Sequence, residues 1–342
     1  MKAYRFYAPN QPLKLEEVPI PKMGPEDVLV KIKASGICGT DVNYKLGKML
    51  PYKTPLITGH EIAGVIEEVG ENVKYLKEGD RVVIHYILSC GRCTHCDQGF
   101  DNRCRNRKSI GAHVDGGFAE YIVVPARNAF ILPNNISFEE GAIIGCAVST
   151  PFHALRLGGF RPGDVVVVYG LGGVGMHGIA WARALGASIV IGVDILDYKL
   201  RLAKEFGADI VINPKEENPV KVIRDVTDGY GADLVLECAG AKETVKAAIE
   251  SVKGKSRYES GRVVIVAHPP GPIEVTSLRE GALYFSGDHT RDELRRIIQL
   301  VKNRRIDLSK SITHRLPFSE LNRAIDLLAE KRENVLKVVV VQ

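Results

Sequence analysis

Residues 164–194, with the sequence DVVVVYGLGGVGMHGIAWARALGASIVIGVD, constrain the fold more than any other stretch of this chain. The valine run at 165–168 predicts a strand buried on both faces, and a second apolar run at 189–193 predicts another. Between them, a glycine-rich turn leads into a helical pattern of apolar residues. A strand, a glycine turn, a helix and a second strand in this order predict the opening unit of a doubly wound parallel sheet.

The spacing of the glycines in this turn indicates what the turn binds. In a Rossmann unit the first glycine permits the tight turn, the second lets the backbone approach a pyrophosphate, and the third lets helix and strand pack closely. The helix N-terminus then faces the phosphates. The predicted cofactor-binding residues of the turn are Gly170, Gly172, Gly173, Val174 and Gly175.

An acidic residue at the end of the second strand supports the same interpretation. Asp194 lies about 20 residues beyond the last glycine, where a carboxylate binds the adenosine ribose hydroxyls of a dinucleotide. A carboxylate there would oppose the 2′-phosphate of NADP, so we expect NAD. The alternatives are that Asp194 caps the helix starting near residue 197, or that the whole stretch is a structural turn that binds no nucleotide.

The rest of the chain follows two patterns, and its 342 residues are enough for two cores. Residues 1–148 contain short strands punctuated by Gly and Pro, which predicts an irregular, mainly antiparallel β domain. Residues 149–287 alternate strands and helices, so the expected fold class is α/β. Strands are expected at 165–169, 189–193, 209–212, 233–238, 262–267 and 283–286.

The C-terminal segment has no obvious place in that parallel sheet. Helices are predicted at about 220–227, 291–303 and 319–331, and the chain ends in a strand at 335–341. Six strands already complete a doubly wound dinucleotide domain. We therefore expect residues 288–342 to return to the first domain.

Composition excludes several classes of partner. The hydrophobic fraction of 45% and the charged fraction of 25% are ordinary for a globular protein. The net charge is only +5, and the basic residues are scattered apart from those at 103–108, so nucleic acid is not an expected partner. The N-terminus lacks an apolar signal core, and no apolar run is long enough to cross a bilayer. We expect a cytoplasmic protein.

Four of the seven cysteines are clustered in one short lobe, at about residues 88–106. The lobe cysteines are Cys90, Cys93, Cys96 and Cys104. Their spacing predicts one tetrahedral zinc bound by four thiolates, which leaves no open position and makes the zinc structural. An iron–sulfur cluster is the alternative, and His95 could replace one cysteine.

Three further residues could bind a metal but are far apart in sequence: Cys38, His60 and Cys146. Singly, each could equally be a core residue. Their motifs change this view. In order, GICGTD, GHEIAGVIEEVG, the four-cysteine lobe, DGGFAEY and GLGGVG resemble the zinc-dependent medium-chain alcohol dehydrogenase family over essentially the whole chain.

The resemblance implies a GroES-like catalytic domain, at 1–148 and 288–342, and a Rossmann coenzyme domain at 149–287. It also implies two zinc ions per chain, with Cys38, His60 and Cys146 holding a catalytic zinc whose fourth position is open. The implied activity is reversible hydride transfer between an alcohol and a nicotinamide cofactor. Lys199 matches a basic residue near the adenosine, which leaves room for NADP.

Three more residues take roles from the same resemblance. Thr40 matches the hydroxyl that accepts the alcohol proton, Asp41 matches the aspartate that orients the zinc-bound histidine, and Glu61 matches a glutamate behind the zinc. Without the family context, Asp41 is a turn residue and Glu61 a solvated strand end. Many relatives have a relay histidine where this chain has Asn43, so the proton must leave by another route. The route then runs through the cofactor ribose and water, or through another group, for which His113 and His153 are the candidates.

The substrate class is less constrained than the reaction. Cys146 favours the alcohol branch, because polyol and threonine dehydrogenases of the family often have glutamate there, whereas GICGTDV resembles the polyol side. We expect a small alcohol, aldehyde or ketone, with a polyol, diol or amino alcohol as the alternative. The remaining alternative is a non-catalytic dinucleotide sensor. Such a protein would be free to lose the zinc ligands, so their presence in this chain argues against it.

Three further expectations complete the sequence analysis. Tyr86 and Ile87 match a substrate-pocket wall of the family, and Cys238 is expected to be a buried thiol. The family also implies a homodimer or homotetramer that pairs through residues 283–286.

Overall fold

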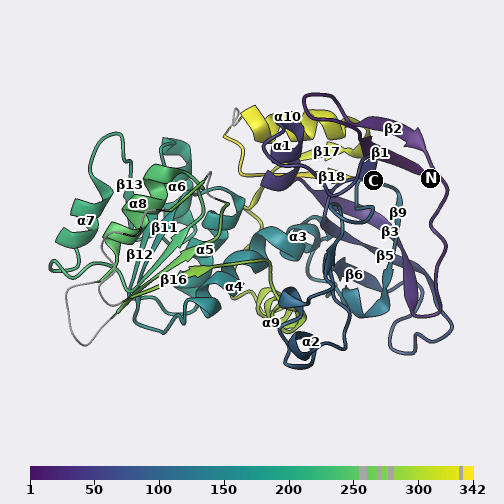
Figure 1. Ribbon diagram of the computed structural model, residues 1–342, viewed down its shortest axis with the longest axis horizontal. Helices are drawn as coiled ribbons and strands as arrows, with labels where there is room; N and C mark the ends of the chain where they lie inside the picture. Colours follow the sequence, from purple (N-terminus) through teal and green to yellow (C-terminus); the bar gives the residue numbers. More distant parts are fainter. Residues whose placement is uncertain (254–259, 269–270, 274, 276–280, 331–333) are drawn as a thin grey trace. The chain divides into compact units, whose positions relative to one another are not determined.

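The computed structural model describes residues 1–253, 260–268, 271–273, 275, 281–330 and 334–342 (Figure 1). They divide into two compact units. Unit 1 comprises Met1–Ser149 and His289–Gln342, and unit 2 comprises Thr150–Asp288. Within the described ranges, no helix is long and apolar enough to span a bilayer.

Unit 2 is built on a parallel sheet, for which six strands lie in the described part of the chain. In spatial order they are β13 (Ile210–Ile212), β12 (Ile189–Val193), β11 (Val165–Tyr169), β14 (Leu234–Glu237), β15 (Gly261–Ile265) and β16 (Gly281–Phe285). The strand order reverses between β11 and β14, which is the topological switch point of a doubly wound sheet. The predicted parallel-sheet fold is confirmed.

The helices of unit 2 follow the strands in alternation (Figure 1). They are α4 (Ser149–Leu157), α5 (Gly173–Ala184), α6 (Asp197–Glu205), α7 (Pro219–Asp225) and α8 (Lys242–Ser251). The central strand β11 is buried along nearly its whole length, as expected for a strand covered on both faces. By contrast, β16 is an edge strand, and its Phe285 is 63% exposed.

Unit 1 contains a larger sheet and two smaller ones among the residues described. The larger sheet has the order β10 (Ala129–Ile131), β6 (Arg81–Ile84), β5 (Glu61–Val69), β3 (Asp27–Gly36), β18 (Lys337–Val341) and β17 (Ile312–Pro317), with β9 (Tyr121–Pro125) also paired to β3. The smaller sheets are β2 (Lys14–Glu17), β1 (Lys2–Phe6) and β4 (Leu56–Ile57), and β7 (Ile87–Leu88) with β8 (Lys108–Ser109).

Most pairings in unit 1 are antiparallel, and β3 alternates buried and partly buried residues along its first half, as the sequence pattern predicts. The C-terminal strand β18 joins this sheet, where Val340 lies opposite Ser35 of β3. The segment leading to Cys38 thus lies beside the C-terminal strand β18.

The remaining elements of unit 1 are helices and helical turns. They are α1 (Gly39–Lys45), α2 (Thr94–Asp97), η1 (Asp101–Arg103), η2 (Ala126–Asn128), α3 (Phe138–Ile143), η3 (Ile144–Val148), α9 (Arg291–Lys302), η4 (Phe318–Glu320) and α10 (Leu321–Glu330). The helix predicted over 319–331 therefore begins with a 3₁₀ turn, and residue 331 lies outside the described residues. The helix predicted over 220–227 ends at Asp225, because Val226 caps it.

Candidate functional site

The glycine turn follows β11 and opens α5 at Gly173, with Gly172 at the N-cap. Gly170 has a φ of 84°, which an L side chain rarely adopts. A Cβ on Gly175 would lie 1.9 Å from the carbonyl oxygen of Gly170, so only glycine permits this contact. A Cβ on Gly172 would meet nothing within 4 Å, so the backbone there faces open space. The first N–H groups of α5, at Gly173, Val174 and Gly175, are free of intrahelical partners and suit an anion.

Asp194 connects this turn to the end of β12. Its Oδ2 accepts a hydrogen bond from the N–H of Leu171 at 2.7 Å, and its Oδ1 accepts one from Leu196 at 3.1 Å. The Nζ of Lys199 lies 3.7 Å from Oδ2. Leu196 is the N-cap residue of α6, so Asp194 also supports the start of that helix. The turn, the acid and the lysine predicted from sequence are therefore neighbours.

The four lobe cysteines lie around one point. All four sulfurs are within 4.8 Å of one another. The Cys93 sulfur lies 3.5 Å from that of Cys96 and 3.9 Å from that of Cys104, and the Cys90 and Cys96 sulfurs are 4.0 Å apart. Four sulfurs about 2.3 Å from one zinc ion lie about 3.8 Å apart, which matches these separations.

The electrostatics of the lobe also fit a cation. The backbone N–H of Cys96 lowers the pKa of Cys93 to about 6, whereas desolvation raises the pKa of Cys96 to about 11, so Cys93 is the thiol that ionises first. The N–H of Cys90 points to the Cys104 sulfur at 3.2 Å, an arrangement that stabilises a thiolate. In a cluster of four irons each thiolate binds a different iron, which separates the sulfurs more widely. The spacing therefore favours a single ion.

A second group forms where three distant segments of unit 1 meet. One ligand atom from each of Cys38, His60, Glu61 and Cys146 lies within 4.8 Å of the others. Cys38 precedes α1, and His60 directly precedes β5. Cys146 lies in η3, a π-helical turn, which is a distortion common at functional sites. The two thiols, the imidazole and the carboxylate converge although the sequence separates them widely.

The charges of this group favour a cation. A hydrogen bond from Cys146 lowers the pKa of Cys38 well below its usual range, and His60 lowers it further. Burial lowers the pKa of His60, but Cys38 and Asp41 outweigh this effect and raise it to about 9. The site thus stabilises positive charge among its ligands, as a zinc site with two thiolates does.

Asp41 and Thr40 lie on the first turn of α1, beside Cys38. The Oδ2 of Asp41 accepts a hydrogen bond from the N–H of Cys38 at 2.8 Å. Its Oδ1 is buried and has no hydrogen-bond partner among the described residues, and burial raises the Asp41 pKa to about 6. The Thr40 hydroxyl lies 3.9 Å from the Cys38 sulfur. Both side chains are therefore next to the candidate metal ligands.

The structure also reveals a residue that sequence reasoning missed. Lys337, at the start of β18, is 3% exposed and donates to both carboxylate oxygens of Glu61, at 2.8 and 2.6 Å. It also donates to the carbonyl oxygen of Ile37 at 2.7 Å, directly before Cys38. Glu61 is fully buried rather than a solvated strand end. The only sequence signal was a lysine at the start of an otherwise apolar strand.

The other candidates occupy less central positions. Tyr86 packs its ring 4.9 Å from that of His60, and Ile87 is fully buried. His113 stacks on Tyr52, with ring centroids 3.7 Å apart, and its Nδ1 accepts a hydrogen bond from Ser109. These contacts make Tyr86 the neighbour of the metal-ligand group, whereas His113 belongs to a surface pair.

Three residues from the sequence analysis lie outside both clusters. His95 is on α2 but is not part of the lobe's ligand group. His153 is buried on α4, in unit 2, whereas the candidate metal ligands are in unit 1. Cys238 is only partly exposed to solvent rather than fully buried as expected, and desolvation raises its pKa well above the usual value.

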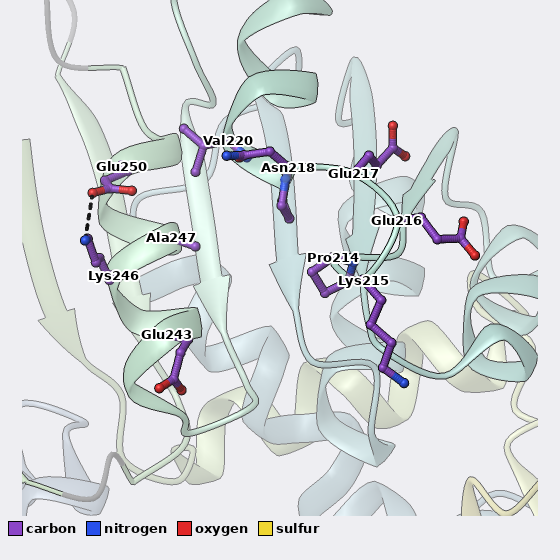
Figure 2. Close-up of a pocket in the computed structure, with 11 residues that line it drawn as sticks. Pro214, Lys215, Glu216, Glu217, Asn218, Val220, Glu243, Lys246, Ala247 and Glu250 are labelled. Carbon is purple, nitrogen blue, oxygen red and sulfur yellow. Dashed lines mark hydrogen bonds and ion pairs between the residues drawn. The ribbon is translucent and has the colours of Figure 1, made fainter.

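A surface pocket in unit 2 lies apart from these residues. Figure 2 shows its lining, from the segment after β13 and from α8: Pro214, Lys215, Glu216, Glu217, Asn218, Pro219, Val220, Glu243, Lys246, Ala247 and Glu250. Lys246 and Glu250 form an ion pair at 4.0 Å across one helical turn. None of the site residues predicted from sequence lines this pocket, and its charged groups come from the turn after β13 and from α8.

Comparison with known proteins identifies the family. Residues 24–134 match the alcohol dehydrogenase GroES-like domain, and residues 173–303 match the zinc-binding dehydrogenase domain. An alcohol dehydrogenase of Geobacillus stearothermophilus is 38% identical over 99% of this chain and 100% of its own length. An L-threonine 3-dehydrogenase of Symbiobacterium thermophilum is 34% identical over 99% of this chain and 97% of its own length.

A solved structure supports the same assignment. A zinc-binding dehydrogenase of Sinorhizobium meliloti, bound to NADP, superposes with a TM-score of 0.89 at 34% identity, covering 100% of this chain and 99% of its own. With two family domains and relatives of full length, this chain belongs to the zinc-dependent medium-chain alcohol dehydrogenases, which are nicotinamide-dependent oxidoreductases.

Proposed function

We propose that this protein interconverts a small primary or secondary alcohol and its aldehyde or ketone, with NAD as the coenzyme and two zinc ions per chain. The observation that carries the proposal is the convergence of Cys38, His60 and Cys146 from three distant segments. A structural role needs one closed site, which the lobe cysteines can supply. A second site with only three ligands of the usual catalytic kind leaves a position for substrate.

In this proposal Cys38, His60 and Cys146 hold the catalytic zinc, and Glu61 stays paired with Lys337 behind it. When bound, the zinc supplies a Lewis acid that lowers the pKa of a hydroxyl near it. Asp41 fixes the start of α1 by accepting the Cys38 N–H at its Oδ2. Its other buried oxygen, Oδ1, is available to accept a hydrogen bond from the His60 ring. This arrangement would set the tautomer of His60.

Thr40 is the proposed first acceptor of the substrate proton. Its hydroxyl can accept one hydrogen bond while it donates another, so it can pass a proton without carrying a charge. Asn43 cannot titrate, so the next acceptor has to be water or a ribose hydroxyl of the coenzyme. Hydride transfer itself belongs to the nicotinamide.

For the coenzyme we propose the glycine turn, Asp194 and Lys199 as the binding residues. The N–H groups at the start of α5 would face the pyrophosphate. The Asp194 carboxylate would accept hydrogen bonds from the adenosine ribose and oppose a 2′-phosphate. Lys199 weakens that opposition, which leaves NADP as a poorer coenzyme rather than an excluded one.

The substrate class has one serious alternative. Relatives named alcohol dehydrogenase and L-threonine 3-dehydrogenase are almost equally similar to this chain. Cys146 favours simple alcohols, because polyol and threonine dehydrogenases of the family often have glutamate at this position. A panel of ethanol, 2-propanol, butanediol, sorbitol and threonine with NAD tests this choice. If butanediol, sorbitol or threonine is turned over far faster than the simple alcohols, the polyol or amino-alcohol hypothesis is correct.

Metal analysis combined with one substitution tests the site itself. We expect two zinc ions per chain in the native protein and one in Cys38→Ser, with loss of activity. Cys238→Ser is the matched control for metal content, since Cys238 is a free, partly buried cysteine outside both clusters. Full activity in Cys38→Ser would refute the proposed site. One zinc and no turnover in the native protein would instead support a dinucleotide sensor.

We further propose a dimer or tetramer that uses the edge strand β16. This strand ends the unit 2 sheet among the described residues, and Phe285 exposes 63% of its surface there. An exposed apolar edge is a template for pairing with a second chain. A cytoplasmic location fits the many reduced thiols that the two metal sites need.

A further inference from the structure

Glu237 is a buried acid that the proposed mechanism does not use. It is the last residue of β14 and is fully buried. Its Oε1 accepts three hydrogen bonds, from the N–H of Ala239 at 2.9 Å, the N–H of Gly240 at 2.9 Å and the Thr244 hydroxyl at 2.8 Å. Burial raises its pKa, and these three donors oppose that effect. One carboxylate oxygen thus holds together the turn between β14 and α8 by three hydrogen bonds.

This turn touches the glycine turn. A Cβ placed on Gly170 would lie 2.7 Å from both the backbone nitrogen and the Cβ of Ala239. The N–H of Cys238 also donates to the carbonyl oxygen of Tyr169 at 2.8 Å. Ala239 therefore packs directly against Gly170, where its backbone and its Cβ leave no room for a side chain.

The position of this contact in the sheet gives it a functional meaning. The glycine turn leaves β11 and the Glu237 turn leaves β14, and the strand order reverses between these two neighbours. Open parallel sheets bind their ligands outside the carboxyl ends of the strands at such a switch point. The two turns are therefore the two walls of the expected coenzyme crevice, and Glu237 shapes one of them.

The local sequence explains why an acid is needed. Ala241, the N-cap residue of α8, has no side-chain oxygen to accept the first N–H groups of that helix. The Thr244 hydroxyl accepts from the N–H of Ala241 itself at 3.2 Å, which satisfies that donor but not the first N–H groups of the helix. Glu237 anchors Thr244 in turn, and its negative charge lies at the positive end of α8.

We propose that Glu237 is a positioning residue of the coenzyme site: its carboxylate holds the 239–240 backbone against Gly170 and so keeps the crevice in its binding shape. This inference rests on the proposed use of the glycine turn for NAD. It assigns no contact between Glu237 and the coenzyme, so its effect on binding is indirect. It predicts that loss of the acceptor oxygen weakens coenzyme binding more than it weakens folding.

The test compares four variants by titration with NADH, followed by its fluorescence, and by thermal unfolding of the coenzyme-free protein. Glu237→Ala removes all three hydrogen bonds, and we expect the Kd for NADH to rise about tenfold or more. Thr244→Val removes one of them and should raise it about threefold. Glu237→Gln retains an acceptor oxygen for the three donors and should stay within about threefold of the native Kd.

Asp233→Ala is the matched control. Asp233 lies at the other end of the same strand, where its Oδ2 accepts from the Val165 N–H at 2.8 Å and its Oδ1 pairs with Lys253 at 2.8 Å. Its loss should lower the unfolding temperature and leave the Kd for NADH unchanged. A role of Glu237 in stability alone would make the two alanine variants behave alike in both measurements.

The outcomes separate this inference from the function on which it rests. If the native protein fails to bind NADH, the proposed function is wrong. If the native protein binds and Glu237→Ala binds equally well, the inference is overturned. It is also overturned if Asp233→Ala loses as much affinity, or if Glu237→Gln loses as much as Glu237→Ala. Should Glu237→Ala not fold, Thr244→Val decides: a native Kd in that variant contradicts the inference.

Discussion

Replacing Asp194 by Asn should shift the coenzyme preference from NAD toward NADP. The Asp194 carboxylate is 8% exposed and lies between the glycine turn and the start of α6. A 2′-phosphate on the adenosine ribose would bring a second negative group next to it. Removing the carboxylate charge should therefore relieve repulsion of NADP, while NAD loses only a ribose hydrogen bond.

The size of the effect follows from the neighbouring charges. Two unit charges about 4 Å apart interact by about 4 kcal/mol at an effective dielectric constant of about 20. Lys199, with its Nζ 3.7 Å from the carboxylate, cancels part of this field. We expect about 2 kcal/mol of repulsion to remain. That free energy corresponds to about a 30-fold change in the ratio of kcat/KM for NADP to that for NAD.

Steady-state kinetics with both coenzymes, at one fixed alcohol concentration, measures this ratio. Lys199→Met is the matched control: it removes the opposing charge and should move the ratio the other way. Asn can accept from Leu171 or Leu196 but not from both, so we expect a loss of about 1–3 kcal/mol of stability as well. An unchanged ratio in Asp194→Asn would refute the assignment of Asp194 to the adenosine ribose.

Three further predictions concern unit 1 and the sheet edge. Cys93→Ser should remove one zinc per chain and lower the unfolding temperature, as measured by metal analysis and calorimetry; two retained zincs would contradict the four-cysteine site. Lys337→Met should destabilise the protein by about 3–5 kcal/mol in urea unfolding, because it leaves the buried Glu61 carboxylate unpaired, and adding Glu61→Gln should recover part of that loss. Phe285→Lys should reduce the oligomer to smaller species in light scattering at unchanged coenzyme affinity, whereas an unaffected oligomer would mean that β16 is not the interface.

The parallel-sheet unit could be predicted closely from sequence because its signals are local. The valine run, the glycine turn and Asp194 lie within one short stretch, and each constrains the backbone of its own neighbours. The strand positions followed from apolar runs, and the structure differs mainly at their ends. The clustering of the lobe cysteines could also be predicted from sequence, because ligands a few residues apart can reach one ion whatever the rest of the fold.

The second group of candidate metal ligands could not be predicted from local sequence spacing. Cys38, His60 and Cys146 each look like core residues, and only their family motifs linked them. Sequence periodicity reports which residues are buried, whereas strand pairing decides which buried residues meet. The return of β18 to the side of β3 brings Lys337 to Glu61, and no pattern near either residue announces that contact.

Glu237 shows the same division at smaller scale. By itself, the sequence predicted that β14 is a buried strand and that a glycine turn follows β11. The tertiary structure decided that these two strands are neighbours at the switch point, so that the turn after one strand packs against the turn after the other. The sequence near each turn predicts its local structure. The contact between the turns after β11 and β14 depends on the order in which the strands pair.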